Sequence, residues 1–255
     1  LSESQLPSFM LWLQSQRCQL FGLKLRAGSR SPQVSEQLMQ ALCSNSPTDV
    51  RIKWEGPFVV LGPAVGRAAQ LQRLTVEAHS FEIRPSLRQL AALTTLALTH
   101  ASGYFSAPTL CPSWLPASLA SLHLEGMPSN PFQPGGHFPR PLADVHLDFY
   151  TEGQGRGRRG AGAVPAGVEA LARLPELPGL TSLKLGGDAD IFEVPQQLST
   201  LTALRQLNLY SALQLTNCDP MLPLLGMLQL THLDLSLCWL MTLPTGILRL
   251  PHLQV

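Results

Sequence analysis

The chain has 255 residues, of which 14% are charged, and its net charge is only +1, so it lacks the basic excess of a protein that binds polyanions over its whole surface. Fifty leucines and a hydrophobic fraction of 45% argue against a disordered chain, which needs low hydrophobicity and high charge. The apolar runs are broken by proline and are far shorter than the roughly 20 residues of a membrane span, so we expect no membrane insertion.

The N-terminal residues 1–19 precede the first sequence repeat, and we expect them to form a flanking helix. The chain starts at Leu1 and stops at Val255 in the middle of a repeat. We therefore interpret it as a portion of a longer protein.

A six-residue motif, LxxLxL or a conservative variant of it, recurs along the chain with a period of about 24 residues. Its first positions are Leu20, Pro47, Leu71, Leu93, Leu119, Leu142, Leu180, Leu204 and Leu230, with a tenth, incomplete copy at Leu253. Positions four and six of each copy are leucine, isoleucine or valine. Because alternate residues of a strand face the same way, this spacing predicts a short strand with one buried face in every repeat.

The segments between these strands are about 18 residues long, which predicts parallel strands joined by helices or irregular turns. We expect short helices over residues 33–43, 64–71, 85–92, 166–174 and 194–200. Proline-broken segments at 112–117, 131–141 and 220–223 are expected to be 3₁₀ or extended.

The one long spacing between motifs contains a Gly/Arg-rich insertion, residues 151–167. Its composition cannot build a core, so we interpret it as a surface loop. It includes a formal GxGxxG from Gly155 to Gly160, but the surrounding strands do not follow the order of a dinucleotide-binding fold, which disfavours a nucleotide site.

The repeat resembles that of leucine-rich repeat proteins, and the stretches VPQQLSTLTALRQLNL and LPTGILRLPHLQV are similar to the intracellular subtype. The resemblance implies an α/β solenoid of nine to ten repeats, with a curved parallel sheet on the concave side and helices, 3₁₀ turns and irregular segments on the convex side. It also implies that residues 1–255 are a single domain. The family's usual asparagine at position nine is replaced throughout, and only Asp188 and Cys238 could imitate its side-chain bond. The N-terminal stretch resembles algal proteins that carry an F-box upstream, although this chain contains no F-box.

The five cysteines form no CxxC pair, which disfavours a disulfide framework or a zinc site. We expect free thiols and a cytoplasmic location, with the nucleus or the ciliary axoneme as alternatives. The axonemal alternative comes from the resemblance alone.

A basic cluster occupies the solvent-facing positions of the first three strands, at Lys24, Arg26, Arg51, Lys53 and Arg73. Trp54 directly follows Lys53, and we expect it to be an exposed or half-exposed contact residue. Asp49 and Glu77 are the acidic residues that occupy solvent-facing motif positions on the same strands. Two acids against five cations leave a positive excess, so we expect an acidic partner segment to dock there, with a simple solubilising role as the alternative.

Further along the chain, His123 and His146 take the same position of successive repeats, with Glu125, Asp148 and Asp144 nearby. Such a group can bind a metal, but an ordinary polar surface also explains it, and we favour the surface. Near the C-terminal end, Tyr210, Asp234 and Trp239 add candidate contacts, although Trp239 can instead fill a gap between repeats.

No nucleophile, base and orienting group share a catalytic motif, so we predict a protein that is not an enzyme and has no cofactor. The predicted function is noncatalytic protein–protein recognition through the concave face. Two alternatives remain, namely the substrate-recognition part of an F-box ubiquitin ligase, and RNA binding through the basic N-terminal face and the Gly/Arg loop.

Overall fold

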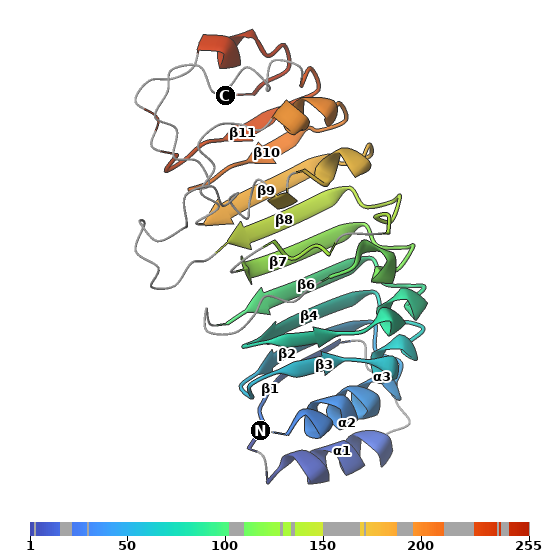
Figure 1. The fold of residues 1–255 in the computed structure, drawn as a ribbon. Coiled ribbons are helices and arrows are strands. Elements are labelled where there is room, and N and C mark those ends of the chain that lie inside the picture. Colours follow the sequence, from blue (N-terminus) through green and yellow to red (C-terminus); the bar gives the residue numbers. More distant parts are fainter. Residues whose placement is uncertain are drawn as a thin grey trace. The chain divides into compact units, whose positions relative to one another are not determined.

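The computed structural model describes residues 1–2, 4–15, 22–29, 31–101, 110–127, 130–133, 136–149, 169–170, 172–187, 196–211, 227–238, 240 and 245–254 (Figure 1). They fall into two compact units. The first unit comprises Leu1–Leu124 with Pro131–Pro141, and the second comprises Glu125–Asn130 with Leu142–Val255. That residues 1–255 form a single domain stays a prediction.

The first unit alternates strands with short return segments. Its elements in chain order are α1 (Leu6–Ser15), β1 (Gly22–Ala27), α2 (Pro32–Cys43), β2 (Asp49–Trp54), β3 (Val59–Leu61), α3 (Pro63–Gly66), β4 (Arg73–Ala78), β5 (Phe81–Ile83), η1 (Pro85–Gln89), β6 (Thr95–His100), η2 (Pro112–Trp114) and β7 (Ser121–Met127), the last of which ends in the second unit. The strands of its main sheet follow the order β1-β2-β4-β6-β7. The helix predicted within residues 1–19 is present as α1.

Equivalent motif positions lie side by side in this sheet. Val50 of β2 is in register with Leu74 of β4, which is in register with Leu96 of β6. All three are at most 1% exposed. The strand phase read from the sequence is therefore correct, because positions four and six face the packed side in each of these strands.

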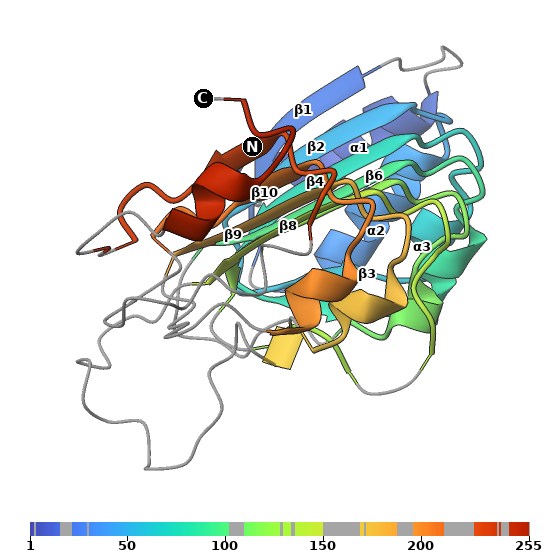
Figure 2. The same ribbon diagram turned by 90° about the horizontal axis from the view of Figure 1, so that it is seen from above.

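The return segments cover one side of the first unit's sheet, where α2 and α3 lie beneath the strands (Figure 2). The helix predicted over 33–43 is confirmed as α2, whereas the one predicted over 64–71 ends at Gly66. The helix predicted over 85–92 is instead the 3₁₀ helix η1, and the proline-broken segment 112–117 contains the predicted 3₁₀ turn as η2.

A second ladder, which we did not expect, joins the beginnings of the return segments. The strands β3 and β5 pair in parallel, and Leu110 forms an isolated parallel bridge with Phe132 within the segment 131–141, expected to be 3₁₀ or extended. The residues of β3 are all buried, so the period-two alternation that marks a strand is missing there.

The second unit continues the same pattern with β8 (Asp144–Phe149), η3 (Leu174–Glu176), β9 (Ser182–Gly187), η4 (Gln196–Thr200), β10 (Gln206–Asn208), β11 (His232–Asp234) and η6 (Thr245–Arg249). Its strands follow the order β8-β9-β10-β11 and are parallel. The helix predicted over 194–200 is the 3₁₀ helix η4. Of the helix predicted over 166–174, residues 169 and 170 are described as α-helical, and Leu174 begins the 3₁₀ helix η3. The segments 151–167 and 220–223 lie outside the described residues.

Backbone hydrogen bonds repeat at the entrances to β9, β10 and β11 in the second unit. Thr231 N donates to Arg205 O, and Gln254 N donates to Thr231 O, both at 2.8 Å. The incomplete tenth motif at Leu253 therefore lies in step with the ninth, as predicted. Within the described residues, no helix is long and apolar enough to cross a membrane.

Candidate functional site on the open face of the sheet

The side of each sheet that faces away from the buried leucines is the candidate site, and we call it the open face. It carries the side chains of motif positions three, five and seven. The alternation is clearest in β2, where Val50, Ile52 and Trp54 are buried while Arg51 and Lys53 are exposed. A strand with one packed side leaves the other side available for contacts.

Ion pairs cross the open face of the first unit. Arg26 of β1 pairs with Glu55, which directly follows β2, and Lys53 of β2 pairs with Glu77 of β4. Each is a pair of one cation with one carboxylate, and the side chains of both cations are at least 48% exposed. Exposed pairs of this kind stabilise a fold by only about 0–1 kcal/mol, so their main effect is to fix where the charges lie.

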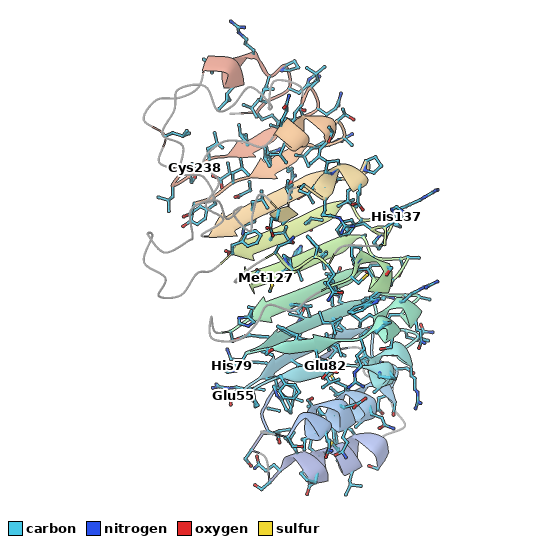
Figure 3. The ribbon with its side chains drawn as sticks, in the orientation of Figure 1. Glu55, His79, Glu82, Met127, His137 and Cys238 are labelled. Atoms are coloured by element: carbon cyan, nitrogen blue, oxygen red, sulfur yellow. The ribbon has the colours of Figure 1, made fainter. Side chains whose placement is uncertain are left out.

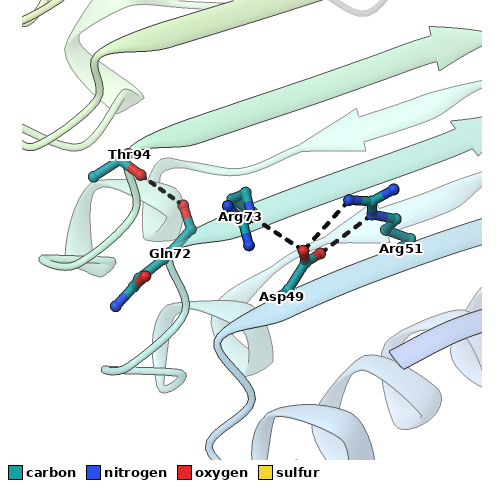
Figure 4. Close-up of polar contacts among 5 residues, drawn as sticks. All are labelled: Asp49, Arg51, Gln72, Arg73 and Thr94. Atoms are coloured by element: carbon teal, nitrogen blue, oxygen red, sulfur yellow. Dashed lines mark hydrogen bonds and ion pairs between the residues drawn. The ribbon is translucent and has the colours of Figure 1, made fainter. Parts of the chain in front are cut away.

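A third group has two cations around one carboxylate. Arg73 Nε lies 3.0 Å from Asp49 Oδ2, and Arg51 Nε lies 3.4 Å from Asp49 Oδ1 (Figure 4). Asp49 and Arg73 are in register on β2 and β4. To their left in this view, Thr94 Oγ1 donates to Gln72 O at 3.1 Å, which ties the entrance of β6 to that of β4.

The basic cluster predicted from the sequence is thus present on β1, β2 and β4, but it is better neutralised than expected. Glu55 was missed, because it stands at motif position nine, where the family pattern places an asparagine in the turn (Figure 3). The side chain of Lys24 lies outside the described residues.

Trp54 is not an exposed contact residue, which corrects the prediction. It is 2% exposed, because position eight of the strand points to the packed side. A Cβ at Gly56 would lie 2.4 Å from Trp54 Nε1, so the indole occupies the space that a side chain at position 56 would need. The Gly two residues after the tryptophan is the sequence signal that could have indicated this packing.

His100 is a buried histidine at the end of β6. It is 6% exposed, and neither ring nitrogen has a hydrogen-bond partner among the described residues. Burial lowers the pKa of His100, and the nearby charge of His79 lowers it further. The neutral imidazole is therefore the form that fits the folded first unit.

The predicted histidine group is divided between the units. In the first unit, His123 Nε2 lies 3.0 Å from Ser121 Oγ. In the second, His146 Nδ1 lies 3.6 Å from Glu125 Oε1. His146 is 8% exposed rather than solvent-facing, because Glu125 contacts its ring and Lys184 stands beside it in register on β9. Among the described residues, no group of three or more metal-type ligands comes together.

Two glycines end β9 next to Asp148, another predicted contact residue, which is half-buried on β8. A Cβ at Gly186 would lie in ordinary contact with the Asp148 carboxyl group, at 3.4 Å. Gly187 has φ +68°, and a Cβ there would lie 1.9 Å from Phe149 O. Only glycine fits at this second position.

A polar group closes β10 and β11. Asn208 Nδ2 donates to Asp234 Oδ2 at 2.8 Å, and Asn208 Oδ1 accepts from Tyr210 N at 2.9 Å. Hydrogen bonds from Ser236 are the main reason why the pKa of Asp234 is lowered, and Asn208 adds to the effect. Tyr210 lies beside this group and is 44% exposed, so it is accessible as the sequence predicted. Trp239, the other aromatic candidate, lies outside the described residues.

Cys238 takes the family's asparagine position, and its side chain makes the predicted substitute bond. Its Sγ donates to Leu209 O of the preceding repeat at 2.9 Å, and the residue is 2% exposed (Figure 3). Asp188, the other candidate, lies outside the described residues. The described cysteines Cys43, Cys111 and Cys238 are all free.

No protein-family model matches this chain, and no curated protein matches it. Among solved structures, the mouse RP105/MD-1 complex contains a chain with 20% identity and a TM-score of 0.53, matched over 85% of this chain and 35% of that one. This chain thus spans about a third of the length of the mouse chain. A leucine-rich repeat protein of Leptospira interrogans also matches, with 16% identity and a TM-score of 0.45 over 100% of this chain and 75% of that one. An internalin from Listeria monocytogenes matches with 15% identity and a TM-score of 0.29 over 96% of this chain and 87% of that one.

The fold is therefore a leucine-rich repeat fold. Within the described residues, the nine complete motifs provide nine strands, and the return segments are short helices, 3₁₀ turns and extended pieces. The fold class predicted from the sequence, an α/β leucine-rich repeat solenoid, is confirmed. The narrower resemblance to F-box-associated algal proteins is not shown by these comparisons.

Proposed function

We propose that this chain is a noncatalytic protein-recognition module that binds its partner through the open face of the sheet. The observation that carries the proposal is the set of cross-strand ion pairs on β1, β2 and β4, which present charges at fixed positions on a surface of parallel strands. Fixed charges favour the correct register of a protein partner and exclude wrong ones. The name of the mouse complex, which joins RP105 to MD-1, is consistent with a recognition role for this fold.

The neighbouring strand β6 supports the same proposal. Its open-face residues are Thr95, Ala97 and Thr99, all short and half-buried. Short side chains next to a charged area leave room for a partner's larger side chains, which then contact the sheet at low cost in conformational entropy.

The alternatives from the sequence are less well supported by the described residues. Carboxylates accompany every described cation of the cluster, which weakens a case for RNA binding through phosphate contacts. Nothing in the described residues favours the F-box role over recognition in general. The free thiols described here agree with a reducing compartment, and we propose a cytoplasmic location.

Photo-cross-linking from the two sides of the first unit tests the proposal. A photoreactive amino acid replaces Thr75 on the open face of β4 or, as a control, the exposed Arg88 of η1. A partner captured in cell extract is identified, purified and recombined with the wild-type chain. We expect capture from position 75 and saturable binding of the purified partner. Capture from position 88 alone would place recognition on the return segments and contradict the proposal.

A further inference from the structure

Among the described side chains of β1, β2 and β4 together with Glu55, the ion pairs leave one positive charge without a counter-charge, at a single place. Arg26 and Lys53 each have their own carboxylate, from Glu55 and Glu77. Asp49 alone is shared, because Arg51 and Arg73 both contact it. Among the described cations and carboxylates of β1, β2 and β4 and Glu55, the excess of one charge therefore lies at the Arg51–Asp49–Arg73 triplet.

The geometry of the triplet holds two guanidinium groups ready for a second anion. The Asp49 side chain is 15% exposed and lies low on the sheet, whereas those of Arg51 and Arg73 are 59% and 60% exposed. Arg73 uses only Nε, and Arg51 uses Nε and Nη2 at 3.4 and 3.5 Å. No described residue accepts a hydrogen bond from Arg51 Nη1 or from either Nη of Arg73.

Free Nη groups on two neighbouring arginines match a carboxylate well, because the planar guanidinium forms paired hydrogen bonds with such an anion. Asp49 already holds both side chains, so less conformational entropy is lost when they engage a ligand. The charge count selects the ligand. Among the described side chains, one uncompensated positive charge balances a single carboxylate, whereas a doubly charged phosphate would leave an excess of negative charge.

We propose that the Arg51–Asp49–Arg73 triplet is an anion-binding site that receives a carboxylate side chain from an acidic segment of the partner protein. This inference rests on the proposed function, since it assigns a partner chemistry to the open face. It is narrower than the general basic cluster expected from the sequence, because Arg26 and Lys53 are already neutralised.

The test uses a fluorescein-labelled hexaglutamate peptide at low salt, with binding measured by fluorescence anisotropy. The wild-type chain is expected to bind the peptide saturably, and the double variant Arg51→Gln/Arg73→Gln to bind it at least about tenfold more weakly, since two charge-assisted contacts are lost. Asp49→Asn is expected to tighten binding severalfold, because removal of the carboxylate that repels and competes with the ligand outweighs the weaker hold of the amide on the two arginines.

Arg84→Gln is the matched control. Arg84 is also an arginine in contact with carboxylates, but there a single cation lies between two acids, with Nε 2.9 Å from Glu82 Oε1 and Nη1 3.8 Å from Glu36 Oε1. Its substitution should leave peptide binding unchanged. Circular dichroism and thermal midpoints of all variants show whether they are folded, and the exposure of both triplet arginines predicts that they are.

Three results of the peptide and RNA titrations would overturn the inference. The first is no saturable binding of hexaglutamate to the wild type, and the second is equal binding to the Arg51→Gln/Arg73→Gln variant. The third is that a decauridine RNA binds the wild type more tightly than hexaglutamate does, and that the Arg51→Gln/Arg73→Gln variant no longer binds this RNA. That result would assign the site to nucleic acid. A partner captured from position 75 that binds wild type and double variant equally refutes this inference but leaves the proposed function intact. Peptide binding at the triplet, combined with partner capture only from position 88, would refute the proposed function but leave the anion-binding site intact.

Discussion

Leu207→Ala and Asn208→Ala are adjacent substitutions on opposite sides of β10, and together they test the strand phase of the second unit. Leu207 is 1% exposed and lies in register between Leu183 and Leu233. Truncation of a buried leucine removes apolar contacts and leaves a cavity, at a cost of about 2–5 kcal/mol. Leu233 is only half-buried, so the site can partly relax, and we expect about 3 kcal/mol for Leu207→Ala.

Asn208 faces the open side, where substitutions usually change stability by at most about 0.5 kcal/mol, the value that the sequence alone suggests. The structure raises this expectation, because Asn208 bonds both to Asp234 and to the backbone of Tyr210. Loss of these contacts should cost about 1 kcal/mol. The leucine substitution therefore remains the more damaging of the two, but by a smaller margin.

Urea titrations followed by circular dichroism measure both variants against the wild type. We expect a clear fall in the urea midpoint for Leu207→Ala and a smaller one for Asn208→Ala. The dependence of the unfolding free energy on urea concentration should be similar in both variants and the wild type. The thermal midpoint should fall by about 6–12 °C for the leucine variant, given 2–4 °C per kcal/mol in a chain of this size. Equal effects, or a larger effect at Asn208, would show that the strand is one residue out of phase.

Three further predictions follow from single residues. Gly187→Ala should lower the thermal midpoint clearly, because its φ is +68°, whereas Gly186→Ala should change it little. In a background without Cys18 and Cys218, a thiol reagent should modify the half-buried Cys111 before Cys43, since burial raises the pKa of the Cys43 thiol to about 12. The lowered pKa of His100 means that the unfolded chain binds its proton more readily, so urea midpoints should fall as the pH drops below about 6.5, and His100→Leu should reduce that fall.

The motif phase was predictable because each repeat imposes the same requirement on the same positions. Val50, Leu74 and Leu96 stand side by side, as their shared position four implies. The side of each charged residue followed from the same alternation, which placed Arg51 and Lys53 on the open face and Asp49 beside Arg73. Repetition thus determines the strands without any knowledge of the long-range fold.

The misses lie where the chain leaves a strand. Trp54 was misjudged because the strand's alternation continues to position eight and turns the indole inward, and Glu55 was missed because its direction depends on the turn that follows the strand. The pairing of β3 with β5 depends on contacts between neighbouring return segments, and their sequences do not repeat as the strands do. His146 was expected to be exposed because the motif gives the direction of a side chain but not how much its neighbours cover it.

The burial of Trp54 gives the first unit an optical reporter of its own folding. The described tryptophans, Trp12, Trp54 and Trp114, all belong to this unit, and Trp54 is far less exposed than Trp12, which is 50% exposed. An indole in an apolar setting emits at shorter wavelength than one in water. In a Trp239→Phe background every emitting tryptophan lies in the first unit, so fluorescence would follow that unit alone while circular dichroism follows the whole chain. Transitions that coincide would mean that the repeats melt as one cooperative block, and separate transitions would mean that the solenoid comes apart in stages.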